Sequence, residues 1–596
     1  MPNRTPWPAA QATVPSPPAA PRRPRAVCGL LLGALLLSAC AAPWSLATPT
    51  PPATTAPPTA APSAAPPPTL PPPTTPPPPT APPTAIPVTD DLALTAAGLT
   101  VFPGPQQYSG DLLTFDVRPE NMGALDPNGV EVRIYRGAPD PASLVAAGRA
   151  NYYSFDGVPR ARMIWTWDTA GLVGEQTLVA WLDPDDAIQS GDENPYNNLV
   201  TFTLNLLPAE GLPEPEAAAD WVSTTLPCCV VHYLDDSSAG RDIAAIAAET
   251  AAAVAEVESQ MGLDLTDRLR FYLIDRVIGH GGYAYDAVVL SYLDRHYAGF
   301  DLAVVVRHEA THVLDGQIAA IYPPTMLREG LATYMGGGHF KPEPIPQRTA
   351  ALLELGYYIP LTQLVGDFYR QQHEVGYLEA AGLIAYLVET YGWDQFRTFY
   401  ASFPGDGTSS AQQLDATLAR VYGQGLEATE ESFRAWLRAL PPDPAQVRDL
   451  RDTVALFDTI RRYQAELDPS AYWMSGFLAN PGEGEQRGIV ADFVRRPRAP
   501  ENIALETMLI AAREKLRAGA FDEGEALIAA VNDALDTGDW SPAPASDYLA
   551  LVQAVAAAGY EAQWIDLEGD TARVTAIAVW PQLEVLTLQR AGNGWK

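Results

Sequence analysis

The stretch RHEATHVLDG, at positions 307–316 of the 596-residue chain, carries two histidines four residues apart. On a helix these positions share one face, so His308 and His312 can direct imidazole nitrogens at one metal ion about 2.0–2.1 Å away. Glu309 is turned by about a hundred degrees around the helix and can reach a water beside the metal without being a ligand. The pattern predicts a zinc site with its own general base. The alternative is a helix whose two histidines are purely structural.

A catalytic zinc site needs a third protein ligand and one position left open for water. Glu329 follows His312 by seventeen residues, within the segment TMLREGLATYMGGG at 325–338. Two prolines precede this segment and a glycine run closes it, as is typical of a helix. Two antiparallel helices joined by a short loop would set Glu329 opposite the histidines. Alone, Glu329 would be interpreted as a solvated helix charge, but beside the HEATH motif it is the predicted third ligand.

The segments around the motif predict an α+β domain over residues 221–445. A long helix is expected at about 242–261, because its apolar residues recur on one face and Gly262 follows them. The chain then becomes mainly helical from the motif to about Leu440, and a small sheet followed by helices is an α+β arrangement. The expected strands are CVVHYL at 229–234, RLRFYLI at 268–274 and AVVLSYL at 287–293.

These motifs resemble a known family. His308-Glu309-x-x-His312 followed by Glu329-Gly330-Leu331-Ala332 is similar to the thermolysin-like gluzincins, zinc metallopeptidases whose third ligand is glutamate. The chain looks still more like the bacterial peptidase MA-like domains over about residues 229–440, because GYLEAAGLIAYLVETYGWDQF at 376–396 matches their downstream helix. The resemblance implies a zincin-type fold, with a small mixed sheet above the HExxH helix, a helical lobe below it and a cleft between them.

The resemblance also implies roles for individual residues. One zinc ion per chain would be bound by His308, His312 and Glu329, and Glu309 would act as general base and later as general acid. Tyr377 occupies the position of the family's downstream tyrosine, which makes it the candidate donor to the oxyanion. A packed core tyrosine is the alternative at that position.

The surroundings of the ligands depart from the thermolysin group. Four residues after its glutamate ligand, that group has an aspartate that orients a zinc-bound histidine, and here the position is Thr333. The orienting group must therefore differ, with Asp315 or a backbone carbonyl as candidates. His339, just beyond the glycine run, is a weaker candidate for the oxyanion donor, and an ordinary loop residue is the favoured alternative at that position. The stretch at 279–289 is a candidate edge strand for an extended peptide.

The N-terminus predicts export and lipid anchoring. An arginine-rich start precedes a fourteen-residue apolar run at 26–39, which is too short to span a bilayer but suits a signal peptide. LSAC at 37–40 resembles the lipobox of bacterial lipoproteins, which implies a signal peptide over 1–40 and a lipidated Cys40; the alternative is a signal peptide cleaved nearby. Residues 41–88, almost all Pro, Thr and Ala, predict a disordered stalk. We therefore expect an extracytoplasmic protein anchored to the bacterial cell membrane.

The remaining segments predict accessory domains. Residues 89–207 contain short strand-like runs between turn clusters and predict an all-β immunoglobulin-like sandwich. The stretch from Asp183 through SGDENPYNNLVTFTL, which ends at position 204, resembles the last hairpin of bacterial adhesion-related, CARDB-like domains. An acidic linker is expected at 208–220, and a small helical or α+β accessory domain at 446–596. The expected runs are 112–117, 130–135, 177–182 and 199–206 in the sandwich, and 571–579 and 583–590 near the C-terminus.

The net charge of the chain excludes one class of partner. The net charge of −33 argues against nucleic acid, whose phosphates need basic surfaces. Cys228 and Cys229 are adjacent, which permits a strained disulfide or two small buried residues at a strand start.

The predicted domains together give a multidomain fold class: a β-sandwich, a zincin-type α+β domain and a small α+β region. The leading function is a membrane-anchored zinc metallopeptidase acting on peptides or proteins; the alternative is a non-catalytic binding or adhesion lipoprotein that retains the fold.

Overall fold

The computed structural model describes residues 92–596, apart from positions 105, 121–128, 154–159, 189–191, 193, 276–280, 285–286, 406–407, 442, 470, 473–479 and 593. The predicted signal peptide and stalk lie outside the described residues, so anchoring through Cys40 stays a prediction. The described residues all belong to one compact unit. Among the described helices, none combines the length and apolarity needed to cross a bilayer.

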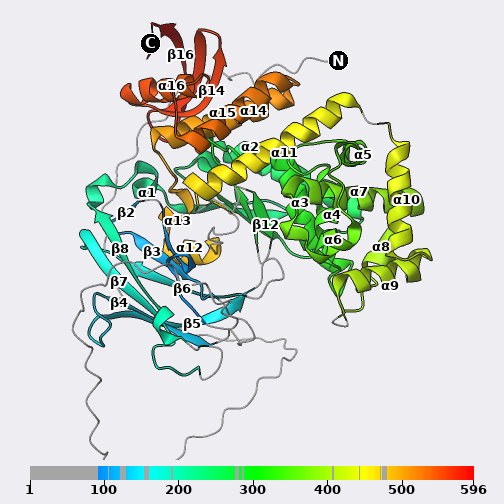
Figure 1. Ribbon diagram of the computed structural model, residues 1–596, viewed down its shortest axis with the longest axis horizontal. Coiled ribbons are helices and arrows are strands. Elements are labelled where there is room, and N and C mark those ends of the chain that lie inside the picture. The colour runs from blue at the N-terminus through cyan, green and yellow to red at the C-terminus, as the bar shows by residue number, and fades with distance from the viewer. Residues whose placement is uncertain are drawn as a thin grey trace, which may run out of the picture. The chain divides into compact units, whose positions relative to one another are not determined.

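The N-terminal part of this unit is rich in strands (Figure 1). All four predicted runs are confirmed as strands, and the described residues also contain β5 and β6, which the sequence did not predict. In the described residues the strands pair in the order β1-β3-β6-β5-β4-β7-β8-β2. Their bounds are β1 Leu99–Phe102, β2 Gln107–Tyr108, β3 Leu112–Val117, β4 Val130–Arg136, β5 Leu144–Tyr153, β6 Arg160–Asp168, β7 Gly174–Leu182 and β8 Leu199–Leu207.

Both halves of this sheet contribute to one core. Val132 and Ile134 alternate inward on β4, while Phe115 of β3 faces the same core from the other half. Phe115 stacks on Trp165 of β6 with ring centroids 5.1 Å apart. Alternation of this kind buries one face of each strand. The β-rich domain is therefore present, and its immunoglobulin-like identity stays a prediction.

A second, mixed sheet begins the next part of the chain. Its strands are β9 Trp221–Thr225, β10 Cys229–Leu234, β11 Leu269–Ile274, β12 Gly282–Ala284 and β13 Val288–Ser291, in the order β12-β13-β11-β10-β9. Strand β10 runs parallel to β11, and β11 to β13, so the chain must cross over between them. Helix α2, Ser238–Met261, makes the first crossover and begins four residues before its predicted start. Strand β12 lies at one edge, within the predicted edge segment.

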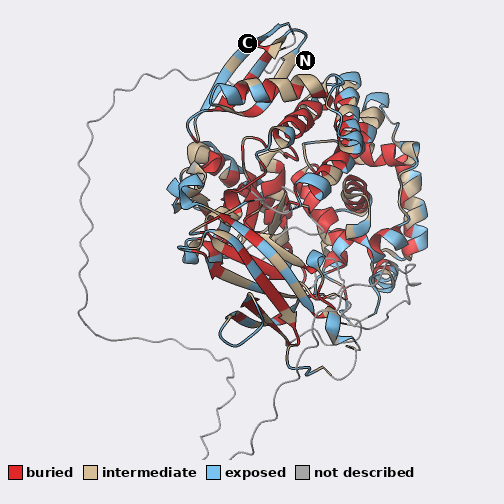
Figure 2. Ribbon diagram, turned by 60° about the vertical axis from the view of Figure 1, so that its left-hand side comes forward, coloured by how far each residue is buried: buried red, intermediate tan, exposed pale blue. Residues whose placement is uncertain are grey.

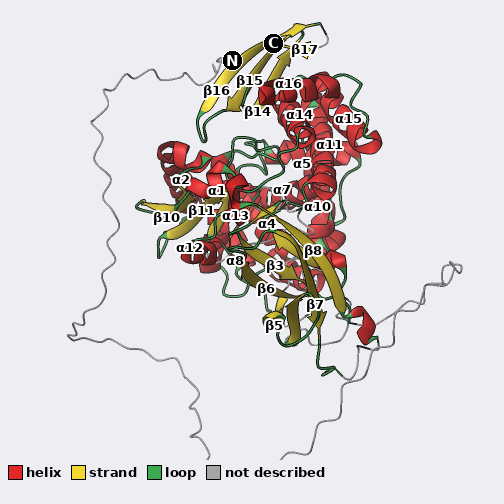
Figure 3. Ribbon diagram, turned by 90° about the vertical axis from the view of Figure 1, so that its left-hand side faces the viewer, coloured by secondary structure: helices red, strands yellow, loops and turns green. Residues whose placement is uncertain are grey.

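Helices follow this sheet, as predicted (Figure 3). Val305, Val306 and Ala310 of α3 join the core beneath the sheet, which includes residues of β10, β11 and β13. Helix α4 instead joins the core of the helical lobe with α7, and most residues of both helices are buried. Figure 2 shows the buried residues in red. The bounds are α3 Leu302–Leu314, η5 Asp315–Gln317, α4 Thr325–Gly336, α5 Ile345–Leu355, α6 Leu361–Gly366, η6 Phe368–Arg370, α7 His373–Tyr391, α8 Trp393–Tyr400, α9 Ser410–Tyr422 and α10 Leu426–Ala439.

The C-terminal region packs directly on the parts before it. Buried Arg295 bonds to Glu506 of α14 at 2.5 Å and to Glu561 of β14 at 2.8 Å. Ile489 and Phe493 share a core with the mixed sheet. Both predicted strand runs are confirmed as strands that pair with each other, and β14, which was not predicted, pairs with the first of them, β15. The bounds are α11 Pro444–Leu467, α12 Pro481–Arg487, α13 Ala491–Val494, α14 Pro500–Arg517, α15 Phe521–Thr537, α16 Ala545–Ala557, β14 Glu561–Glu568, β15 Thr571–Ile577, β16 Leu583–Ala591 and β17 Gly594–Trp595.

The segment expected to be a linker carries structure of its own. Helix α1, Glu214–Ala218, lies within it, and Arg495 bonds both to Glu216 at 2.8 Å and to Asp111 at 2.8 Å. These ion pairs join the β-rich domain, α1 and the segment after α13. Cys228 and Cys229 are free thiols at the start of β10, and burial raises the pKa of Cys229.

Candidate metal centre

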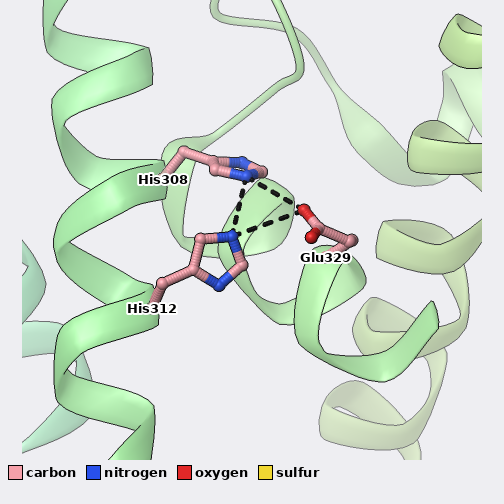
Figure 4. Close-up of side chains that lie close together, drawn as sticks. All are labelled: His308, His312 and Glu329. Carbon is pink, nitrogen blue, oxygen red and sulfur yellow. Dashed lines mark hydrogen bonds and ion pairs between the residues drawn. The ribbon is translucent and has the colours of Figure 1, made fainter. Parts of the chain in front are cut away.

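Three predicted ligands meet at one point between α3 and α4 (Figure 4). His312 Nε2 lies 3.2 Å from His308 Nε2 and 3.4 Å from Glu329 Oε2, and His308 Nε2 lies 3.3 Å from the same Glu329 oxygen. Two atoms that ligate a tetrahedral zinc at about 2.0–2.1 Å are separated by about 3.3–3.4 Å. Two imidazoles and one carboxylate form a donor set that zinc accepts, so these residues fit a zinc ion in spacing and chemistry.

Helix α3 places the histidines. Asp301 caps its N-terminus by accepting a hydrogen bond from Val304 N at 3.2 Å. Val306 and Ala310 of this helix are buried in the core beneath the sheet, which fixes the rotation of the helix about its axis. Positions 308 and 312 then project from the opposite side, toward α4, as expected for residues one turn apart. The sequence thus aims both imidazoles by burying the apolar face of the same helix.

Helix α4 is held against both of its neighbours. Arg307 of α3 donates from Nε and Nη2 to Gly336 O, at 3.1 and 2.7 Å, and so ties the end of α4 to the motif helix. A Cβ at Gly330 would lie 2.8 Å from the backbone of Ala380 on α7, so only glycine permits this close approach. Glycine after Glu329 therefore lets α4 lie deep enough to bring the carboxylate to the histidines.

Glu309 and Glu329 are both buried, but the pKa values of their carboxylates shift in opposite directions. Burial alone would raise the pKa of Glu329, but the charges and hydrogen bonds of His312 and His308 hold it well below its usual value. Burial raises the pKa of Glu309 to about 7, with Glu329 adding to the rise and His308 opposing it. Within the described part of the chain, Glu309 Oε2 is buried and has no hydrogen-bond partner. Glu329 is thus a carboxylate prepared for a cation, and Glu309 has an oxygen available for a water.

A tyrosine that the sequence did not predict supports the third ligand. Tyr369, in η6, donates from its hydroxyl to Glu329 Oε1 at 2.7 Å. This is the oxygen that does not face the histidines, so the bond orients the carboxylate without competing with the other donors. Tyr369 follows Glu329 by 40 positions in a short 3-10 turn, and no periodicity or spacing in the sequence indicates the contact.

Tyr377, the predicted oxyanion donor, lies beside the site on α7. Its ring centroid is 6.0 Å from that of His308 and 4.3 Å from that of His339, on which it stacks with the ring planes 10° apart. Burial and the Glu329 carboxylate hold the pKa of Tyr377 well above its usual range, so its hydroxyl stays a donor. His339 is buried and its Nδ1 lies 2.9 Å from Glu374 Oε2, which makes it a support for the tyrosine ring.

The expected role of Asp315 is wrong. Its Oδ2 accepts hydrogen bonds from Arg328 Nε at 3.2 Å and from the Tyr400 hydroxyl at 2.8 Å, so it ties α4 to α8. Among the described residues, His312 Nδ1 has no partner. Thr333 is buried, and its Oγ1 also lacks a partner within the described ranges. The orienting contact found here is on the carboxylate, through Tyr369, and not on a histidine.

A cavity of about 980 Å³ opens in front of the three ligands. The mixed sheet contributes Gly282 of β12, where a Cβ would lie 3.1 Å from Glu309 Oε1, so this edge strand runs directly past the predicted base. Phe457, Asp458 and Arg461 of α11 line the same cavity. The region after residue 446, in which the sequence indicated no chemistry, therefore forms part of the site's wall.

Comparisons with known proteins give only weak neighbours. No family model matches the sequence, and no curated protein matches it. The M1 zinc metallopeptidase from Deinococcus radiodurans aligns with 59% of this chain and 94% of its own, at 16% identity and a TM-score of 0.25. A CARDB domain from Pyrococcus furiosus, in complex with di-metal ions, aligns with 20% of this chain and 88% of its own, at 18% identity and a TM-score of 0.15. Because both scores are low, neither neighbour establishes the fold or activity of this chain.

Proposed function

We propose that this protein is a zinc-dependent peptidase whose metal is held by His308, His312 and Glu329. The observation that carries the proposal is the triangle of donor atoms, with sides of 3.2, 3.3 and 3.4 Å. Hydrogen bonds give similar distances between two side chains, but two imidazole nitrogens and one carboxylate oxygen converging on a single point form the ligand set of a tetrahedral ion. The open cavity in front of the triangle supplies the room that a catalytic site needs for water and substrate.

Zinc at this position would supply a Lewis acid that polarises a scissile carbonyl and lowers the pKa of a water molecule. Glu309 would take the proton from the attacking water on Oε2, the oxygen left without a partner among the described residues, and pass it to the leaving amine. The burial that raises the pKa of Glu309 to about 7 suits both steps, because a group that titrates near the working pH can accept and release a proton.

The two tyrosines would have separate roles. Tyr369 is a positioning residue, because its hydroxyl is committed to Glu329 Oε1 at 2.7 Å. Tyr377 lines the cavity beside His308 and would donate to the oxyanion that forms on the carbonyl. Strand β12 runs past Glu309 at the sheet edge, where an extended peptide can add as a further strand.

The N-terminal sequence supports a proposed location for the enzyme. The apolar run at 26–39 and the LSAC stretch support lipidation of Cys40, and the Pro/Thr-rich residues 41–88 support a stalk. We place the peptidase outside the cytoplasm on the bacterial membrane as part of the same proposal.

The test is zinc content and peptide cleavage of the full chain. We expect about one zinc per chain, lost in Glu329→Ala and kept in Glu354→Ala, a matched control on the exposed side of α5. Cleavage of a peptide library should require zinc and be abolished in Glu309→Gln, which should still bind the metal. A parent protein without zinc after reconstitution contradicts the proposal. Zinc binding without cleavage of any peptide would favour a binding lipoprotein that retains the fold.

A further inference from the structure

Helix α11 brings an arginine into the cavity that no step of the proposed reaction uses. Arg461 lines the cavity together with His308, Glu309 and Tyr377. Arg461 and Tyr377 line the same cavity, and the ring of Tyr377 lies 6.0 Å from that of His308. The rest of the region that carries Arg461 has only structural roles, so the position of this cation on the cavity wall needs an explanation.

Arg461 has no counter-charge in the part of the chain that the structure describes. Its Nη1 donates to Gln464 Oε1 at 2.9 Å, and its Nε is buried without an acceptor. Asp458, one turn earlier on the same helix, is directed elsewhere, since its Oδ1 accepts from Gln372 Nε2 at 3.1 Å. Burial of a guanidinium without a carboxylate is unfavourable, and it lowers the pKa of Arg461.

Another arginine in the cavity is already engaged. Arg328 pairs with Asp315 at 3.2 Å and lies over the Tyr322 ring at 4.2 Å. Arg461 forms no ion pair among the described residues, although other residues anchor its helix, α11. Asp449 on this helix binds Lys341 at 2.7 Å and also pairs with Arg348. The scaffold therefore fixes the place of the guanidinium, leaves its charge unpaired among the described residues, and engages Nη1 only with the uncharged Gln464.

We propose that Arg461 binds a carboxylate of the substrate, so that this site prefers peptides carrying a negative charge near the scissile bond. The planar fork of donors matches a carboxylate and can bind it through two parallel hydrogen bonds. The carboxylate is either the peptide's C-terminus or an Asp or Glu side chain, and both have the same chemistry. The preference is local and opposes the overall charge of −33, which by itself would repel such peptides. The inference deepens the proposed peptidase function and rests on it for the identity of the ligand as a peptide.

The test measures binding with the full-length Glu309→Gln protein, which does not consume its ligand. Three hexapeptide pools are compared by equilibrium dialysis and mass spectrometry. The first pool has a free C-terminus and the second an amidated C-terminus, and neither contains Asp or Glu. The third pool is amidated and carries a single Glu in each peptide. We expect the first or the third pool to bind at least about tenfold more tightly than the second, which has no carboxylate, as for a hydrogen bond to a charged group. An advantage of the first pool identifies the C-terminus, and an advantage of the third a side chain.

The same pools are then bound to arginine variants in that background. Arg461→Gln should remove the advantage and Arg461→Lys should keep part of it. Arg462→Gln, the next residue, should keep all of it, because Arg462 pairs with Glu466 at 2.8 Å and Asp536 at 2.7 Å outside the cavity. Equal binding of all three pools, or an advantage that survives in Arg461→Gln, overturns the inference. Failure of the parent protein to cleave any pool would overturn the peptidase function alone, since the binding result decides the role of Arg461 independently.

Discussion

Replacing Tyr369 by phenylalanine should weaken zinc binding without disturbing the fold. The hydroxyl donates one hydrogen bond, 2.7 Å long, to the Glu329 oxygen that does not face the histidines. Without it, the carboxylate can rotate about its last torsion and must lose that freedom again when the metal binds. A hydrogen bond to a charged group contributes about 1.5–3 kcal/mol, which corresponds to about 10–150-fold in affinity. Contacts of this kind around metal ligands typically change affinity by about 10–100-fold.

The measurement is the zinc dissociation constant of the full chain, obtained by competition with a chromophoric chelator near neutral pH. Tyr422→Phe is the matched control, because that hydroxyl is buried at the end of α9 and has no partner among the described residues. Tyr377→Phe should change zinc affinity less and slow peptide cleavage more, because its hydroxyl is assigned to the oxyanion. A Tyr369→Phe protein that binds zinc as tightly as Tyr422→Phe would refute the positioning role and with it the orientation argument.

Three further outcomes follow from the same contacts. Glu309→Gln should lower peptide turnover by about 10²–10⁴-fold with little change in zinc content, and an equal loss of zinc would contradict its role as a base. Gly330→Ala should cost about 1–3 kcal/mol in chemical denaturation through overpacking against the α7 backbone, whereas Gly366→Ala, with open space around it, should cost little. Asp492, bonded to Thr114 Oγ1 at 2.5 Å, has its pKa raised by burial to about 7 from 3.8, so the folded state retains its proton more tightly than the unfolded chain. The free energy of unfolding should therefore fall as pH rises from about 4 to about 7. The fall should reach up to about 4 kcal/mol, at about 1.36 kcal/mol per pKa unit. Denaturation measured over this pH range should show no such decline in Asp492→Asn.

Most elements of the fold could be predicted because their signals are local. The apolar period of α2 and its glycine cap, the β-branched runs of β10, β11 and β13, and the alternation on β4 each follow from residues close together in sequence. Strands β5, β6 and β14 were missed because pairing with other strands, rather than their own residue pattern, stabilises them.

The sequence by itself determined which residues could form the metal centre. His308 and His312 are one helical turn apart, so a helix alone brings them together. The tertiary structure decided that Glu329 meets them, through the packing of α4 between α3 and α7. It also decided that Tyr369, rather than Asp315, orients a ligand, and that Arg461 from a distant helix lines the cavity. Contacts of this kind depend on how whole helices pack, and no spacing along the chain encodes them.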